Sequence, residues 1–273
     1  MWFQEVYFGL DKSKKLWGLI CKACEVFNDF EFLMLPSIEI RKEAIAPDGL
    51  VVGQSGNGFM CLRRDWTESV ARFLSKHTEL ELPLKVFYLG STFSTRGESF
   101  QLGIEVIGDS TIDAEILVIK KIQNFLRVSA LEDLKIIIGD VSIVRWLLRE
   151  NTELFSAVLQ KNLSALKHHQ ELRELVLAQG GETMVEDFAR KYPELRGACE
   201  RLLELGRNLQ SVEFDLSEVR SQEYYSGMVF EFFCGGLPFA VAGGGRYDGL
   251  YRALGRDLPA VGGAIYLDAL LEL

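Results

Sequence analysis

The sequence predicts an α+β fold, in which an antiparallel sheet is flanked by helices and carries a helical insertion. Hairpin signals recur along the chain, and helical patterns lie before, between and after them. This order favours a sheet with helices packed on it over a regularly alternating parallel fold. With 273 residues the chain can bury a large core, and we expect residues 1–273 to form a single domain.

The N-terminal half is predicted to begin with a helix. Leu16, Ile20 and Cys24 recur every four residues, which indicates a helix over residues 11–29. The turn-forming segment GQSGNG at residues 53–58 separates two apolar runs and indicates a hairpin. The other elements expected here are a short strand, the two hairpin strands, a helix and two longer strands, within residues 32–36, 51–62, 70–74, 85–90 and 100–108.

The C-terminal half mixes strands with a long helical block. A capping signal at Ser110 precedes an amphipathic helix that runs to about Leu126. Residues 141–210 are rich in leucine and charge and lack strand patterns, so we expect them to form the helical insertion. The remaining expected elements are strands at 135–139, 212–216, 228–233 and 238–242, the last two joined by a Gly-Gly turn, and a helix at 266–273.

Composition argues against several classes of protein. The net charge is −9 and no block of basic residues stands out, which argues against a nucleic-acid partner. No apolar run approaches the ~18 residues of a membrane-spanning helix. The first residues also lack the basic region and cleavage site of an export signal. We therefore expect a cytoplasmic protein that binds a small molecule or another protein, with no membrane partner.

Cys21 and Cys24 form a Cys-x-x-Cys pair, a spacing found in redox and metal sites. The residues around them are apolar, so burial of both thiols on a packed helix face is the favoured interpretation. His77, His168 and His169 are distant in sequence and leave little material for a metal centre. Neither a metal nor a cofactor is expected.

Two patterns in the sequence could belong to a ligand pocket. Gly243, Gly244 and Gly245 precede Arg246, and glycines let backbone approach either a ligand or another strand closely. The segment has neither the Walker pattern nor the dinucleotide-binding pattern. On the strand at 100–108, Gln101 and Glu105 share one face and could line a pocket or simply face solvent. Spacing alone leaves these alternatives open.

Several segments together resemble one known family. They are Pro36, LRRDWTESVAR at 62–72, FQLGIEVIG at 100–108, Arg220 with YYSG at 224–227, and AGGGRYDG at 242–249. In their order they resemble the catalytic core of class II histidyl-tRNA synthetases. They resemble more closely the synthetase-like regulatory subunits of ATP phosphoribosyltransferase, the first enzyme of histidine biosynthesis.

The resemblance implies a histidine pocket. Its candidate contacts are Asp65, Thr67 and Gln101 for the α-ammonium, Arg220 for the carboxylate, Glu105 and Tyr224 for the imidazole, with Tyr225 and the segment Gly243, Gly244, Gly245 and Arg246 beside them. An ammonium is satisfied by carboxylates and neutral oxygens, and an arginine fork suits a carboxylate.

The departures from the synthetase pattern concern ATP. Phe93 is followed by Ser94 where the synthetases have an arginine, and the following segment is too short for their ATP-binding loop. In the third motif Ala269 replaces a second arginine, and Tyr266 replaces a glycine. Because cations around the triphosphate are needed for adenylate formation, we expect no catalytic residues and no aminoacylation activity.

The resemblance thus implies a non-catalytic regulatory subunit. It would bind and activate the short-form catalytic subunit, contribute to feedback inhibition by histidine, and pair with a second copy of itself. The sequence ends where a synthetase would begin its anticodon-binding domain, so none is expected. The alternative is an active ligase that adenylates histidine or a related amino acid.

Overall fold

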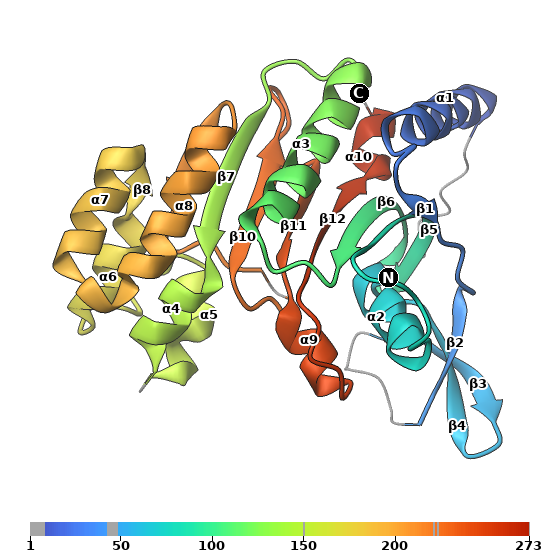
Figure 1. Cartoon of the computed structure of the whole chain (residues 1–273), viewed down its shortest axis with the longest axis horizontal. Helices are drawn as coiled ribbons and strands as arrows, with labels where there is room; N and C mark the ends of the chain where they lie inside the picture. The colour runs from blue at the N-terminus through green and yellow to red at the C-terminus, as the bar shows by residue number, and fades with distance from the viewer. Residues whose placement is uncertain (1–8, 43–48, 150, 221, 223, 273) are drawn as a thin grey trace.

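The computed structural model describes residues 9–42, 49–149, 151–220, 222 and 224–272 (Figure 1). The first eight residues, to which the prediction of no export signal refers, lie outside this description. The described residues form a mixed α/β structure with a nine-stranded sheet, a three-stranded sheet and helices packed around them. The predicted fold class is therefore confirmed.

The chain begins with helix α1 (Leu10–Val26), as the apolar spacing predicts. Its buried residues, Leu19, Ala23 and Val26, lie on one face because they are three or four positions apart. Phe27 follows directly and stacks on Phe125 with ring centroids 5.8 Å apart. This contact fixes the end of α1 against the helix that covers the main sheet.

The three-stranded sheet contains the predicted hairpin. Its strands β2 (Ile38–Arg41), β3 (Val51–Ser55) and β4 (Gly58–Leu62) are arranged in the order β2-β4-β3. The hairpin of β3 and β4 confirms the interpretation of the glycine-rich turn, whereas β2 carries no clear strand signal in the sequence. Figure 1 shows this sheet at one end of the molecule, below β1 and β5.

The main sheet has the strand order β1-β5-β6-β12-β11-β10-β7-β9-β8. Its strands are β1 (Glu31–Phe32), β5 (Leu84–Ser94), β6 (Gly97–Ile107), β7 (Lys135–Asp140), β8 (Gln179–Gly180), β9 (Val212–Asp215), β10 (Met228–Phe233), β11 (Ala242–Arg246) and β12 (Ala260–Tyr266). Most neighbours are antiparallel, as predicted. The pairs β1–β5 and β7–β9 are parallel, because helical segments or long connections separate the two strands of each pair.

The prediction of a strand at 238–242 is wrong, because β11 begins at Ala242 and contains the three glycines themselves. A Cβ on Gly244 would lie 2.5 Å from the Cα of Gly263 on the neighbouring strand. Glycine is therefore required where β11 and β12 pack closely, although glycine-rich segments seldom indicate a central strand. The same glycine content hides β12 from the periodicity of the sequence.

Helices cover both faces of the main sheet. On one face α3 (Ile112–Val128) packs against β6, β11 and β12. On the other, α2 (Trp66–Lys76) packs beside the short helix α9 (Asp248–Ala253). The chain continues from β12 into α10 (Leu267–Glu272), which contacts β6 and α1. The face under α2 carries the candidate site.

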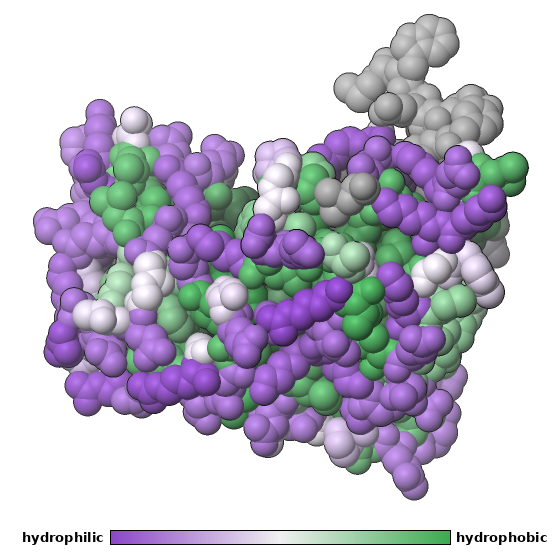
Figure 2. Space-filling model, turned by 90° about the horizontal axis from the view of Figure 1, so that it is seen from above, coloured by the Kyte–Doolittle hydropathy of each residue, from purple (hydrophilic) through white to green (hydrophobic). Residues whose placement is uncertain are grey.

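Residues 141–210 are mainly helical. They contain α4 (Val141–Leu148), α5 (Phe155–Leu159), α6 (Gln170–Leu177), α7 (Glu182–Lys191) and α8 (Arg196–Asn208). The exception is β8, whose two residues extend the main sheet beside β9. Seen from above, this block forms one end of the molecule and hydrophilic residues predominate on the visible face (Figure 2).

No helix in the described part of the chain is both long enough and apolar enough to cross a bilayer. Cys21 and Cys24 are exposed on α1, so the predicted burial of both thiols is wrong. The buried face of the helix falls on Leu19, Ala23 and Val26 instead, and the two cysteines lie beside it.

Candidate ligand-binding site

A small cavity of about 40 Å³ lies on the face of the main sheet that α2 covers. Its lining brings together six of the seven residues predicted to contact histidine: Asp65, Thr67, Gln101, Arg220, Tyr224 and Tyr225. They come from the start of α2, from β6 and from the segment before β10. The fold therefore assembles these residues from three separate parts of the chain.

The N-terminus of α2 supplies the first group. Asp65 is the N-cap, and its Oδ1 accepts a hydrogen bond of 2.8 Å from the backbone N–H of Glu68. Its Oδ2 accepts from the phenol of Tyr224 at 3.1 Å. Burial raises the pKa of Asp65. A cation in the cavity would lower that pKa again by favouring the ionised carboxylate.

Glu105 is fully buried and is not among the residues that line the cavity. Three hydroxyl groups donate to it: those of Thr67 at 2.9 Å, Tyr88 at 3.0 Å and Tyr247 at 2.6 Å. Burial raises the pKa of Glu105 to about 7, although these three hydroxyls act in the opposite direction. The carboxyl therefore titrates near neutral pH and is already satisfied by protein donors.

The side chain of Arg220 lies over Gly243 of β11. Its Nη1 forms an ion pair with Glu231 of β10, and its Nη2 donates to the hydroxyl of Tyr266 of β12 at 2.5 Å. Burial lowers the pKa of Arg220, but Tyr266, Tyr225 and Glu231 outweigh this effect and raise it overall. The guanidinium is thus a permanent positive charge at one end of the cavity.

Glycines on this face leave room for the polar side chains. A Cβ on Gly243 would lie 3.0 Å from Cζ of Arg220 and would overlap its Nη1. A Cβ on Gly245 would overlap the backbone oxygen of Met228 on β10 and would lie 3.0 Å from Cδ1 of Tyr225. The triple glycine therefore serves two purposes that the sequence leaves open: close strand packing at Gly244 and Gly245, and room for pocket side chains at Gly243 and Gly245.

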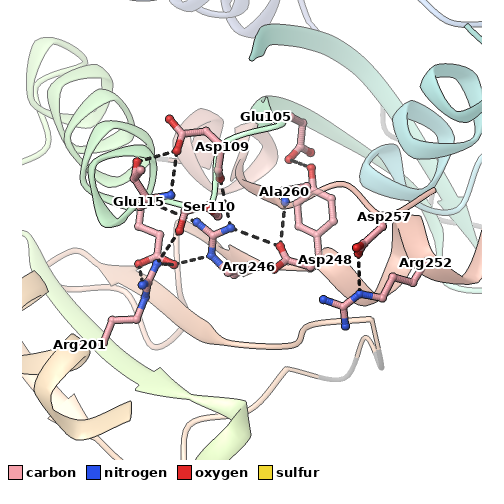
Figure 3. A network of polar contacts seen from close by, with 12 residues as sticks. Glu105, Asp109, Ser110, Glu115, Arg201, Arg246, Asp248, Arg252, Asp257 and Ala260 are labelled. Atoms are coloured by element: carbon pink, nitrogen blue, oxygen red, sulfur yellow. Dashed lines mark hydrogen bonds and ion pairs between the residues drawn. The ribbon is translucent and has the colours of Figure 1, made fainter. Parts of the chain in front are cut away.

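Arg246 neither lines the cavity nor lies at the surface. Its Nε forms an ion pair of 2.6 Å with Glu115 of α3, and its Nη1 contacts Asp248 at 3.3 Å (Figure 3). Arg201 of α8 binds the same buried Glu115 at 2.8 Å. The inclusion of Arg246 in the pocket segment is therefore corrected, because side chains alternate along a strand and Arg246 faces α3.

Other residues of the site carry only weak sequence signals. Tyr88 of β5 lies opposite Gly103 of β6, between the two predicted polar positions, and its ring stacks on Trp66 at 4.5 Å. Tyr266 lies opposite Gln101 across the β6–β12 pair. Strand register alone places these tyrosines on the pocket face, and register is not visible before the strands are paired.

The arrangement suits a small zwitterion. One carboxylate, several hydroxyls and the amide of Gln101 line the cavity together with the guanidinium of Arg220. A cavity of about 40 Å³ holds only one or two water molecules, so an amino acid enters only when lining side chains move. Within the described ranges, no group of three His, Cys, Asp or Glu side chains is placed to hold a metal ion.

The region that binds ATP in the synthetase pattern is reduced. Strands β5 and β6 are joined by Thr95 and Arg96 alone, since Ser94 pairs directly with Gly97. Asp268 of α10 accepts a hydrogen bond of 2.8 Å from the backbone N–H of Phe100, and the adjacent Ala269 is buried. The short connection agrees with the prediction that a long loop is missing here.

Comparisons with known proteins agree with this geometry. The sequence model of a family described as Histidyl-tRNA synthetase matches residues 35–270. An ATP phosphoribosyltransferase regulatory subunit from Aquifex aeolicus is 35% identical over 291 aligned positions, which cover 98% of this chain and 74% of the relative.

Solved structures show the same fold. An ATP phosphoribosyltransferase regulatory subunit/histidyl-tRNA synthetase from Bacillus halodurans superposes with a TM-score of 0.87 at 24% identity, covering 100% of this chain and 83% of that one. A chain of an ATP phosphoribosyltransferase complex from Thermotoga maritima superposes with a TM-score of 0.67 at 22% identity, covering 95% of this chain and 98% of that one.

Proposed function

This chain belongs to the family of ATP phosphoribosyltransferase regulatory subunits with a histidyl-tRNA synthetase-like fold, and we propose that it binds and activates a short-form catalytic subunit. The observation that carries this proposal is the match to a named regulatory subunit over 98% of the chain. The complex from Thermotoga maritima, in which a similar fold occurs, also supports it. In this function the chain catalyses no reaction itself.

Histidine is the proposed effector of the pocket. Asp65, Thr67 and Gln101 would receive its ammonium and Arg220 its carboxylate. Its imidazole would be met by Tyr224 and Glu105, whose present donors would have to rearrange. Feedback inhibition then requires that histidine binds the inhibited arrangement of the complex more tightly than the active one.

We further propose that the chain has no aminoacylation activity. Ser94 and Ala269 stand where the synthetase pattern has arginines, so two cationic groups of adenylate chemistry have no counterpart at these positions. Loss of such electrostatic groups typically costs orders of magnitude in rate. The alternative is an amino-acid-adenylating ligase, and histidine-dependent exchange of pyrophosphate into ATP by the purified chain would establish it instead.

Self-association is part of the proposal. Ile38, Ile40, Val51 and Val52 of the three-stranded sheet are all about half exposed or more, and pairing with a second copy would cover such side chains. Light scattering of the purified chain tests this expectation. A cytoplasmic location follows from a place in amino-acid biosynthesis and is proposed with it.

The decisive experiment is a reconstitution. The short-form catalytic subunit is purified alone and with this chain, and its rate is measured in both states. We expect the two proteins to co-elute and the rate to rise on addition of the chain. Co-elution without any change in rate, or failure to co-elute, would contradict the proposed function.

A further inference from the structure

The hydroxyl of Tyr266 stands at the carboxylate end of the cavity. Tyr266 is the last residue of β12, opposite Gln101, and its side chain lines the cavity. Arg220 donates to its oxygen from Nη2 at 2.5 Å. A phenol carries one hydrogen and accepts through its lone pairs, so this bond leaves the hydrogen of Tyr266 free to donate. No acceptor takes that hydrogen among the residues that the structure describes.

Glu231 holds the guanidinium from the opposite side. It pairs with Nη1 of Arg220, and it lies on β10, whereas the cavity lies toward β12 and β6. Gly243 lies between, opposite Glu231 in the β10–β11 register, and has no side chain to displace the guanidinium. Glu231 is therefore a positioning residue that leaves Nη2 turned toward Tyr266 and the cavity.

From this geometry we propose that Tyr266 and Arg220 form a two-donor clamp for a free carboxylate, which makes the pocket selective for amino acids with an unesterified carboxyl group. The clamp rests on the proposed function, since the amino acid there is histidine. A carboxylate accepts one charge-assisted hydrogen bond from Arg220 and one from the phenol. An ester or amide lacks the negative charge and loses most of that interaction.

The position of Tyr266 also argues against ligase chemistry in this pocket. An enzyme that activates an amino acid must admit a second reactant at the carboxylate oxygens. Here the side chain of Tyr266, packed partly against the core, stands beside the group that binds the carboxylate. Tyr266 would thus hold the free amino acid and would also block derivatives that carry an added group on the carboxylate.

Calorimetric titration of the full-length chain with histidine, histidine methyl ester and histamine tests the clamp. For the wild type we expect histidine to bind at least tenfold more tightly than either analogue, because a charge-assisted hydrogen bond is worth about tenfold or more in affinity. Tyr266→Phe should weaken histidine binding by about tenfold and change the binding of histamine less than twofold. Tyr192→Phe, whose phenol binds Glu174 far from the cavity, is the matched control.

The outcomes separate this inference from the proposed function. Equal or tighter histidine binding by Tyr266→Phe, or equal binding of histidine and its methyl ester by the wild type, overturns the clamp while leaving the regulatory role intact. A wild-type chain that activates the catalytic subunit but binds no histidine overturns both the clamp and the histidine pocket. Parallel losses for histidine and histamine in Tyr266→Phe also contradict the clamp, because they indicate a general effect on packing.

Discussion

Tyr224 donates a hydrogen bond of 3.1 Å to Asp65, and this bond connects the segment before β10 to the first turn of α2. The two residues are 159 positions apart in the sequence. Asp65 at the same time caps α2 through its other oxygen. One carboxylate therefore fixes a helix start and one wall of the cavity together.

Replacing Tyr224 with phenylalanine removes the donor and keeps the ring. We expect a loss of about 1 kcal/mol in the free energy of unfolding, the typical value of such a bond. Urea denaturation measures it. In a double-mutant cycle with Asp65→Ala the two losses should not add, since each variant removes one partner of the same bond. Additive losses would show that the bond contributes nothing.

The carboxyl of Glu105 should make stability depend on pH. Burial raises its pKa to about 7 from 4.5, so between about pH 4.5 and pH 7 the folded chain holds a proton that the unfolded chain has already released. This contribution to stability is present at low pH and is lost as pH rises from about 4.5 to 7. By linkage the loss is on the order of 3 kcal/mol.

Glu105→Gln removes the titration and keeps an acceptor. The difference in stability between wild type and variant should shift in favour of the variant as pH rises through this window. Glu213→Gln, at an exposed ion pair on β9, is the control and should show no such shift. A pH-independent difference for Glu105→Gln would contradict the raised pKa.

Two glycine-to-alanine substitutions should change the stability of the folded chain in opposite directions. A Cβ on Gly262 would overlap the carboxylate of Glu105 and lie 2.7 Å from the carbonyl oxygen of Ile104. Gly262→Ala should therefore cost at least 2 to 3 kcal/mol, roughly the range of overpacked cores. Gly197 is an exposed helical position with open space around it, and Gly197→Ala should stabilise α8 by about 0.5–1 kcal/mol. Thermal unfolding of both variants decides the question.

Arg246 should matter for stability and not for ligand binding. Its removal leaves Glu115 buried with Arg201 as its remaining partner, and breaking a buried ion pair typically costs about 3–5 kcal/mol. Arg246→Met should thus lower the unfolding temperature and keep the affinity for histidine. If Arg246→Met lost affinity for histidine without losing stability, Arg246 would have to take part in ligand binding.

Local sequence patterns predict many of the helices and strands. The elements that depend on pairing with distant strands cannot be predicted in this way. The helix at α1 and the hairpin of β3 and β4 follow from spacing and turn residues. Strands β11 and β12 could not be found in this way, because their glycines reflect contacts with neighbouring strands rather than strand propensity.

The candidate site shows the same limit. The family pattern indicates Asp65, Gln101 and Arg220, and the fold brings these three to one cavity. It does not indicate the partners Glu231 and Tyr266, which come near Arg220 only through the order of β10, β11 and β12 in the sheet. The small size of the cavity is likewise a property of packed side chains and has no sequence signal.

The measurement that tests the central claim most directly is a histidine titration of the reconstituted complex. The activity of the catalytic subunit is followed with the wild-type chain and with Arg220→Gln, and Arg252→Gln, at an exposed ion pair, is the control. We predict inhibition by histidine with the wild type and the control, and at least tenfold weaker inhibition with Arg220→Gln, because a charged hydrogen-bond donor to the carboxylate is lost. Inhibition that is unchanged by Arg220→Gln, or activity that does not depend on this chain, would contradict the account.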